Sequence, residues 1–125
     1  DDLQVEARVT APRRVPYGLG SYQAVRTLRY VATNTGLVQL SVRCYAVNTL
    51  AGADSLYLNY GLGGALAGSD VTTTFVGGER KRVEGSWVLG VTEGQTYDIS
   101  LFAGRFQNAL DPILLYRFSV VVNLP

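Results

Sequence analysis

The sequence predicts an all-β protein: an antiparallel two-sheet β-sandwich, jelly-roll-like, with about eight strands. Three observations predict this fold. Apolar and polar residues alternate with a period of two along most of the chain, helical periodicity is nearly absent, and glycine or asparagine separates the alternating runs. A length of 125 residues suits one domain with a buried core, so residues 1–125 are expected to form a single β-sandwich domain.

The alternating runs define the expected strands. In the clearest run the even positions from Val38 to Ala46 are apolar, and polar residues or Tyr45 lie between them. Successive side chains of a strand point to opposite faces, so each run has a dry face and a wet face, as in antiparallel sheets. The expected strands cover residues 3–10, 23–33, 37–48, 55–62, 71–76, 80–91, 95–103 and 113–123.

Short glycine-containing segments separate these strands. Residues 34–36, 77–78 and 93–94 are predicted to form hairpin turns, because glycine adopts positive φ without a steric penalty. Residues 61–69, rich in glycine and alanine, are expected to form a mobile loop, and residues 106–112 a longer loop.

An immunoglobulin-like sandwich is the main alternative to the jelly roll. It usually carries two cysteines with a tryptophan between them, whereas this chain has one cysteine, Cys44, and one tryptophan, Trp87. Trp87 lies in phase with Val83 and Leu89, so we expect it in the core. Cys44 shares the apolar face of its strand, which predicts a buried, inert thiol and not a nucleophile.

The sequence offers few of the residue arrangements on which enzyme active sites depend. The chain has no histidine, which removes the commonest general base, the usual serine and cysteine triads and most zinc sites. The carboxylates are scattered, and nothing in the sequence pairs any two of Glu84, Glu93, Asp98 and Asp111 as a hydrolase would need. We therefore expect a protein that is not an enzyme and that uses no cofactor and no metal ion.

Charge and hydropathy argue against two other classes of partner. The net charge is +1, which gives no strong field toward nucleic acid or an anionic membrane. No apolar run approaches the roughly 20 residues that a membrane-spanning helix needs. The expected partners therefore include neither nucleic acid nor a membrane.

One segment has the composition of a protein interface. Residues 12–22 include Arg13, Arg14, Pro16 and Tyr17, and the prolines and glycines nearby oppose both helix and inner strand. A mixture of arginine, tyrosine and apolar side chains is typical of interfaces, which predicts an extended arm lying on a neighbouring subunit. The alternative is a surface loop that joins the first two strands.

The densest charge cluster is the second candidate. Arg80, Lys81 and Arg82 stand between Glu79 and Glu84, and they are interpreted as an electrostatic docking patch. The alternative is a solvated strand whose charges protect a sheet edge from pairing. Ten of the eleven basic residues are arginine, which suits interfaces but equally suits a GC-rich genome.

The eight tyrosines offer a third kind of site. Tyr60, Tyr97 and Tyr116 fit the apolar phase of their strands and are expected in the core. Tyr45 and Tyr57 are out of that phase, and an exposed tyrosine can stack on a sugar ring or anchor a protein contact. A carbohydrate-binding β-sandwich module with these two rings as its platform is therefore the alternative function, and sugar binding stays open.

The small size, the eight β runs, the absence of disulfides, the preference for arginine and the proline-rich basic arm together resemble bacteriophage capsid cement (decoration) proteins. The resemblance implies a non-enzymatic protein that binds the outside of the major capsid protein shell and stabilises it by bridging capsomers. It implies as partners the major capsid protein and copies of the chain itself, as a dimer or trimer. It also implies a place on the capsid surface of the virion, after assembly in the host cytoplasm. The residues expected to bind these partners are Arg13, Arg14, Pro16, Tyr17, Arg80, Lys81 and Arg82.

Overall fold

The computed structural model describes residues 2–9, 22–48, 52–105 and 110–122, which form nine strands and no helix. The strands are β1 (Asp2–Val9), β2 (Gln23–Val31), β3 (Gly36–Asn48), β4 (Asp54–Leu62), β5 (Ala65–Leu66), β6 (Val71–Phe75), β7 (Arg80–Val91), β8 (Thr96–Arg105) and β9 (Leu110–Val122). Among these residues there is no helix long and apolar enough to cross a membrane.

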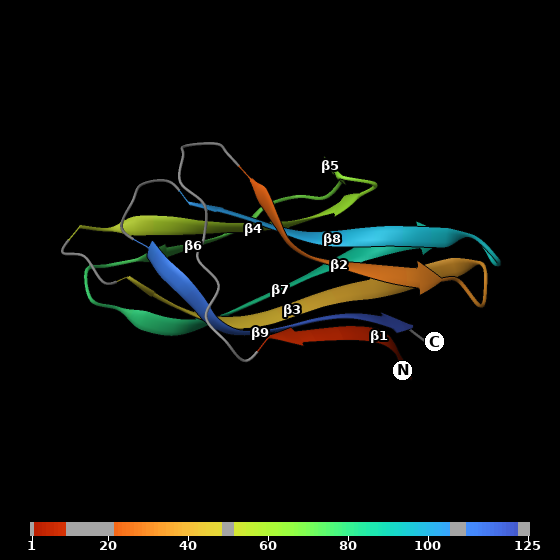
Figure 1. Cartoon of the computed structure of the whole chain (residues 1–125), viewed down its shortest axis with the longest axis horizontal. Helices are drawn as coiled ribbons and strands as arrows, with labels where there is room; N and C mark the ends of the chain where they lie inside the picture. The colour runs from red at the N-terminus through yellow and green to blue at the C-terminus, as the bar shows by residue number, and fades with distance from the viewer. Residues whose placement is uncertain (1, 10–21, 49–51, 106–109, 123–125) are drawn as a thin grey trace.

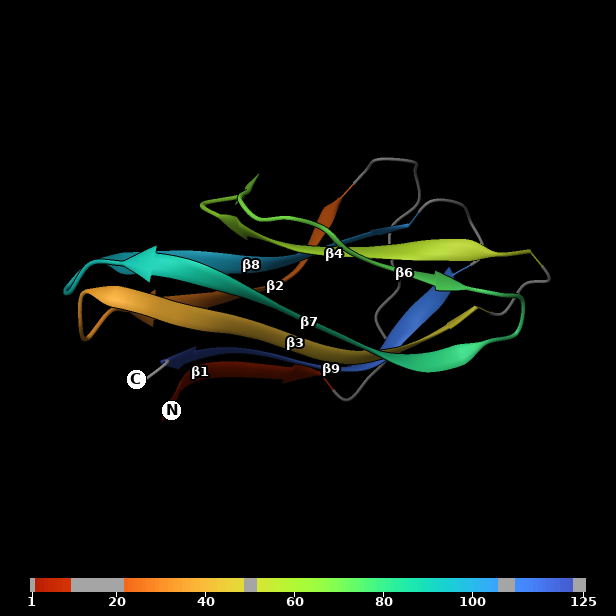
Figure 2. The same cartoon turned by 180° about the vertical axis from the view of Figure 1, so that it is seen from behind.

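The strands form two sheets that pack face to face (Figures 1 and 2). The first sheet has the order β1-β9-β3-β7, and the second has the order β2-β8-β4-β5, with β6 also paired to β4. Every pair is antiparallel. Along the chain, the strands of the first sheet (β1, β3, β7 and β9) are separated from one another by strands of the second sheet. Such repeated crossing between two sheets is typical of a jelly roll. The predicted fold class is confirmed.

The predicted hairpins are wrong, although the turns are in the predicted places. The turns between β2 and β3, β6 and β7, and β7 and β8 each carry the chain from one sheet to the other. Gly36, Gly78 and Gly94 have the positive φ that the turns require. A glycine turn reverses the chain, but the sequence does not reveal whether the returning strand pairs with its predecessor or crosses to the opposite layer.

Two expected loops also differ from the structure. Residues 61–69 were expected to be a loop, yet β5 pairs back onto β4 through Gly61–Leu66 and Leu62–Ala65. Strand β9 begins at Leu110, inside the predicted loop 106–112, and its register on β3 shifts between Ala46 and Asn48. A shift of register accommodates Pro112, which has no N–H to donate to a sheet.

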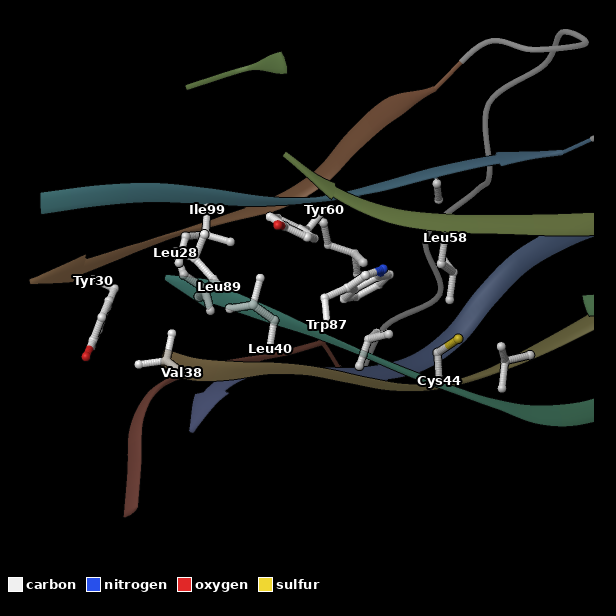
Figure 3. Close-up of a cluster of buried hydrophobic side chains, with 14 of the residues drawn as sticks. Leu28, Tyr30, Val38, Leu40, Cys44, Leu58, Tyr60, Trp87, Leu89 and Ile99 are labelled. Carbon is white, nitrogen blue, oxygen red and sulfur yellow. The ribbon is translucent and has the colours of Figure 1, made fainter. Parts of the chain in front are cut away.

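The core lies between the two sheets (Figure 3). Buried side chains alternate along β3 from Val38 to Ala46, and the facing strand β4 contributes Leu56, Leu58 and Tyr60. Trp87 and Cys44 are both buried, as predicted. Tyr60 is buried against Trp87 with ring centroids 5.6 Å apart, and Tyr97 is partly buried against the same core. The side chain of Tyr116 lies outside the described residues.

Candidate binding surface

No described segment of the chain covers the outer side of β3 and β7, which is here named the β3–β7 face. Because the even residues of β3 fill the core, its odd residues point away from it, and the register places the even residues of β7 beside them. The face consists of Leu37, Gln39, Ser41, Arg43, Tyr45 and Val47 from β3 and Arg80, Arg82, Glu84, Ser86, Val88 and Gly90 from β7.

One half of this face is basic. The register pairs Arg43 with Glu84 and Tyr45 with Arg82. Glu84 Oε2 lies 3.9 Å from Arg43 Nε and 3.8 Å from Arg82 Nε, so one carboxylate forms ion pairs with two guanidinium groups. The guanidinium carbon of Arg82 lies 6.0 Å from the centroid of the Tyr45 ring, which is a cation–π distance. These four side chains, three of them charged, form a cluster that is exposed to solvent.

The other half of the face is apolar. Leu37 is 62% exposed and Val88 is 58% exposed, and Leu37 lies opposite Gly90, which has no side chain to cover it. The pair Ser41–Ser86 separates this apolar half from the basic half. Tyr45, at 39% exposure, is the large aromatic side chain of the face. Exposed apolar surface beside arginine and tyrosine is the composition that protein interfaces favour.

The predicted basic trio is split by the structure. Arg80 and Arg82 are exposed on the β3–β7 face, but Lys81 pairs with the buried Ala46 and so belongs to the opposite side of the strand. Lys81 Nζ donates a 2.7 Å hydrogen bond to the main-chain oxygen of Thr74 and lies 5.1 Å from the Phe75 ring centroid. It also lies 3.5 Å from Glu79. Lys81 therefore ties β7 to β6 and does not contribute to the β3–β7 face.

The position of β7 in its sheet bears on the alternative interpretation of this charged segment, while the docking patch stays a prediction. Strand β7 is the outermost strand of its sheet, which matches the alternative that the charges protect an edge. The same strand supplies half of the bare face. Arg43 is a residue of this surface that sequence reasoning missed, because only the register of β3 on β7 places it beside Arg82 and Glu84.

The other predicted partner-binding residues belong to a part of the chain that the structure does not describe. Arg13, Arg14, Pro16 and Tyr17 lie outside the described residues, so the predicted arm at 12–22 stays a prediction. Only Tyr22, at its end, has a described side chain.

The outer side of the second sheet is partly covered by the chain itself. Residues 63–70 fold back along β4, and Asn59 is buried beneath them, donating hydrogen bonds to Gly68 O at 2.9 Å and Asp70 Oδ1 at 3.0 Å. Tyr22 donates a 2.6 Å hydrogen bond to Asp70 Oδ2. Partial burial and this hydrogen bond raise the pKa of Tyr22 to about 12, so the hydroxyl keeps its proton, and keeps donating, even above pH 10 where a free tyrosine ionises.

The two tyrosines proposed as a sugar platform do not face the same way. Tyr45 projects from β3 on the outside of the first sheet, whereas Tyr57 alternates with buried Leu56 and Leu58 and projects from the outside of the second sheet. The whole thickness of the sandwich separates them, so the two rings do not form one platform.

Two of the carboxylates considered as a hydrolase pair, Glu84 and Asp98, lie on different sheets. Asp98 pairs with Arg29 at 3.2 Å on the second sheet, while Glu84 lies on the first. The side chain of Asp111 is not among those described. Within the described parts of the chain, no three residues of the types that bind metals lie together.

Comparison with protein-family models found no match, and comparison with curated proteins found none either. The fold and the β3–β7 face must therefore carry the functional argument.

Proposed function

We propose that this protein is a structural, non-enzymatic component of a viral particle, a capsid cement protein that binds the outside of the major capsid protein shell. The observation that carries the proposal is the β3–β7 face, where exposed Leu37 and Val88 lie at one end and exposed Tyr45 lies beside three arginines at the other. Exposed apolar side chains gathered with arginine and tyrosine mark a surface that is covered by a partner.

The fold suits this role physically. Strand β3 is hydrogen-bonded on both sides, to β7 and to β9, so the backbone that carries its outward side chains is fixed before any partner binds. A preorganised surface loses little conformational entropy on binding. A shell repeats the same docking site many times, so even weak contacts can bridge neighbouring capsomers when each protein, or a dimer or trimer of it, touches more than one of them.

The proposed arm supplies the second contact. With Arg13, Arg14, Pro16 and Tyr17, residues 12–22 would extend from the domain to a neighbouring subunit. The β3–β7 face and the arm would then bind different subunits, which is how one small domain can hold two capsomers together.

Co-sedimentation with empty capsids of the phage that carries the gene tests the proposal. The wild-type protein is expected to pellet with the shells to a saturating ratio, and deletion of residues 12–20 is expected to weaken both shell binding and self-association. Light scattering across a concentration series reports the second quantity. A wild-type protein that stays in the supernatant at every concentration contradicts the proposed function.

A further inference from the structure

We propose that the β3–β7 face binds an extended, acidic segment of the partner protein, whose carboxylates are received by Arg80, Arg82 and Arg43. This inference rests on the proposed function, because it names the chemistry of the surface to which the protein docks. Glu84 acts in it as an internal counter-ion that a partner carboxylate supplements or displaces.

The first argument is the charge balance of the face. Three arginines and one carboxylate lie on the described strands that build it. Arg80 makes no ion pair with any residue that the structure describes, and Arg43 and Arg82 divide Glu84 between them. The face therefore carries an excess of positive charge, although the whole chain is nearly neutral at +1. A carboxylate-bearing partner is the electrostatic complement of such a surface.

The second argument is the unused hydrogen-bonding capacity of the arginines. The separations of 3.9 and 3.8 Å between Glu84 and the two Nε atoms exceed the length of a hydrogen bond. Each guanidinium carries five N–H donors in a planar fork that fits a carboxylate with two parallel hydrogen bonds. Glu84 thus neutralises part of the charge of Arg43 and Arg82 without occupying their forks.

The third argument is spacing. Arg80 and Arg82 are alternate residues of one strand, so their Cα atoms lie about 6.6 Å apart, and alternate side chains of an extended partner segment repeat at the same interval. Acidic residues at every second position of such a segment would match the two arginines. The apolar half of the face, with Leu37 and Val88, lies farther along the same strands, where it would contact apolar side chains of the partner segment.

The apolar half also distinguishes a protein from a nucleic acid. A duplex backbone would need basic side chains along its path, but beyond the pair Arg43–Glu84 the face presents Ser41, Ser86, Leu37 and Val88. Exposed Leu37 and Val88 gain nothing from a phosphate backbone, whereas they can be buried against apolar side chains of a protein.

The test uses NMR of the ¹⁵N-labelled protein and the Nε–Hε signals of its arginines. The probe is a capped peptide of five Glu-Thr repeats, and the control peptide has five Gln-Thr repeats. The acidic peptide is expected to shift the signals of Arg43, Arg80 and Arg82, and not that of Arg29, which is paired with Asp98 on the second sheet. Glu84→Gln should tighten binding at least threefold, Arg82→Gln should weaken it at least threefold, and Arg29→Gln is the matched control that should change nothing.

Three results would overturn the inference: equal binding of the two peptides, equal affinities of the Glu84→Gln and Arg82→Gln variants, or tighter binding of a 12-base-pair DNA duplex than of the acidic peptide in the same buffer. The same variants in the capsid assay separate this inference from the proposed function. If Glu84→Gln and Arg82→Gln both leave shell binding unchanged, the inference of an acidic docking segment is contradicted and the proposed capsid role is not. Peptide binding that follows the variants, with no shell binding by any of them, contradicts the capsid role alone.

Discussion

The indole nitrogen of Trp87 donates a 2.7 Å hydrogen bond to the main-chain oxygen of Ser69, joining β7 of one sheet to the segment before β6 of the other. The indole ring packs in the core against Tyr60. One side chain therefore fills the space between the sheets and also holds residues 67–70 at their edge. A main-chain hydrogen bond also fixes this segment to β4, since Ala67 N donates to Tyr60 O at 3.0 Å.

Trp87→Phe should lower the free energy of unfolding by about 1–3 kcal/mol, because it leaves a cavity and deprives Ser69 of its donor. Urea denaturation followed by circular dichroism measures the loss, since the substitution removes the only tryptophan. Tyr45→Phe, which deletes a hydroxyl from an exposed ring, is the control and should leave the midpoint unchanged. An unaltered midpoint in Trp87→Phe would show that this bond and the packing around it contribute little.

Gly61→Ala should destabilise the protein by about 1–3 kcal/mol, since added volume in a packed region forces its neighbours to move. A Cβ at Gly61 would lie closer than 3.0 Å to the Phe102 ring and to the main-chain oxygen of Ala65, which cannot move without opening the β4–β5 pairing. Gly52→Ala is the matched control, because a Cβ there meets nothing within 4 Å. Equal thermal midpoints for the two variants would contradict the close packing of β5 on β4.

Alkaline pH should destabilise the protein through Cys44. Burial raises the pKa of its thiol from 9.0 to about 12. Between these values the unfolded chain loses the proton and the folded chain keeps it, so the free energy of unfolding should fall by up to about 1.4 kcal/mol per pH unit above pH 9. Urea titrations at several pH values measure this slope.

Cys44→Ala is the control for the thiol. It should flatten the slope between pH 9 and 10, whereas the loss above pH 10, where unfolded Tyr22 ionises and folded Tyr22 does not, should persist. Identical pH profiles for the wild type and Cys44→Ala would contradict burial of the thiol.

Lys81→Met should lower stability by about 1 kcal/mol, because it removes the hydrogen bond to Thr74 and the cation over Phe75. Arg82→Met, on the bare face, should leave stability within about 0.5 kcal/mol of the wild type. In the acidic-peptide titration the order should reverse, with Arg82→Met weakening binding and Lys81→Met leaving it unchanged. If both variants behave alike in both measurements, the division of these two residues between structure and binding is wrong.

The sequence predicted most of the fold because burial follows alternation. The even residues of β3 fill the core as expected, and eight of the nine strands lie close to the expected ranges. Strand β5 was missed since two residues carry no periodicity. The hairpins were wrong for a different reason: φ at Gly36, Gly78 and Gly94 reverses the chain locally, whereas the choice of sheet depends on burying two apolar faces against each other.

The candidate surface was only partly predictable. Alternation placed Tyr45 out of the apolar phase of its strand, and composition drew attention to Arg80 and Arg82. The proximity of Arg43 to Glu84 depends on the register between two strands some forty residues apart in sequence, which no local pattern encodes. Lys81 carries the same charge as Arg80 and Arg82, but its place in the alternation of β7, opposite the buried Ala46, puts it on the other side of the sheet.

The stability of DNA-filled capsids tests the capsid role most directly. Capsids stripped of this protein and capsids with purified protein added back are heated with a fluorescent dye that reports released DNA. The account predicts that added protein raises the temperature of DNA release to that of native virions, and that protein lacking residues 12–20 does so less well. Release at the same temperature with and without the protein would contradict the proposal that it cements a shell.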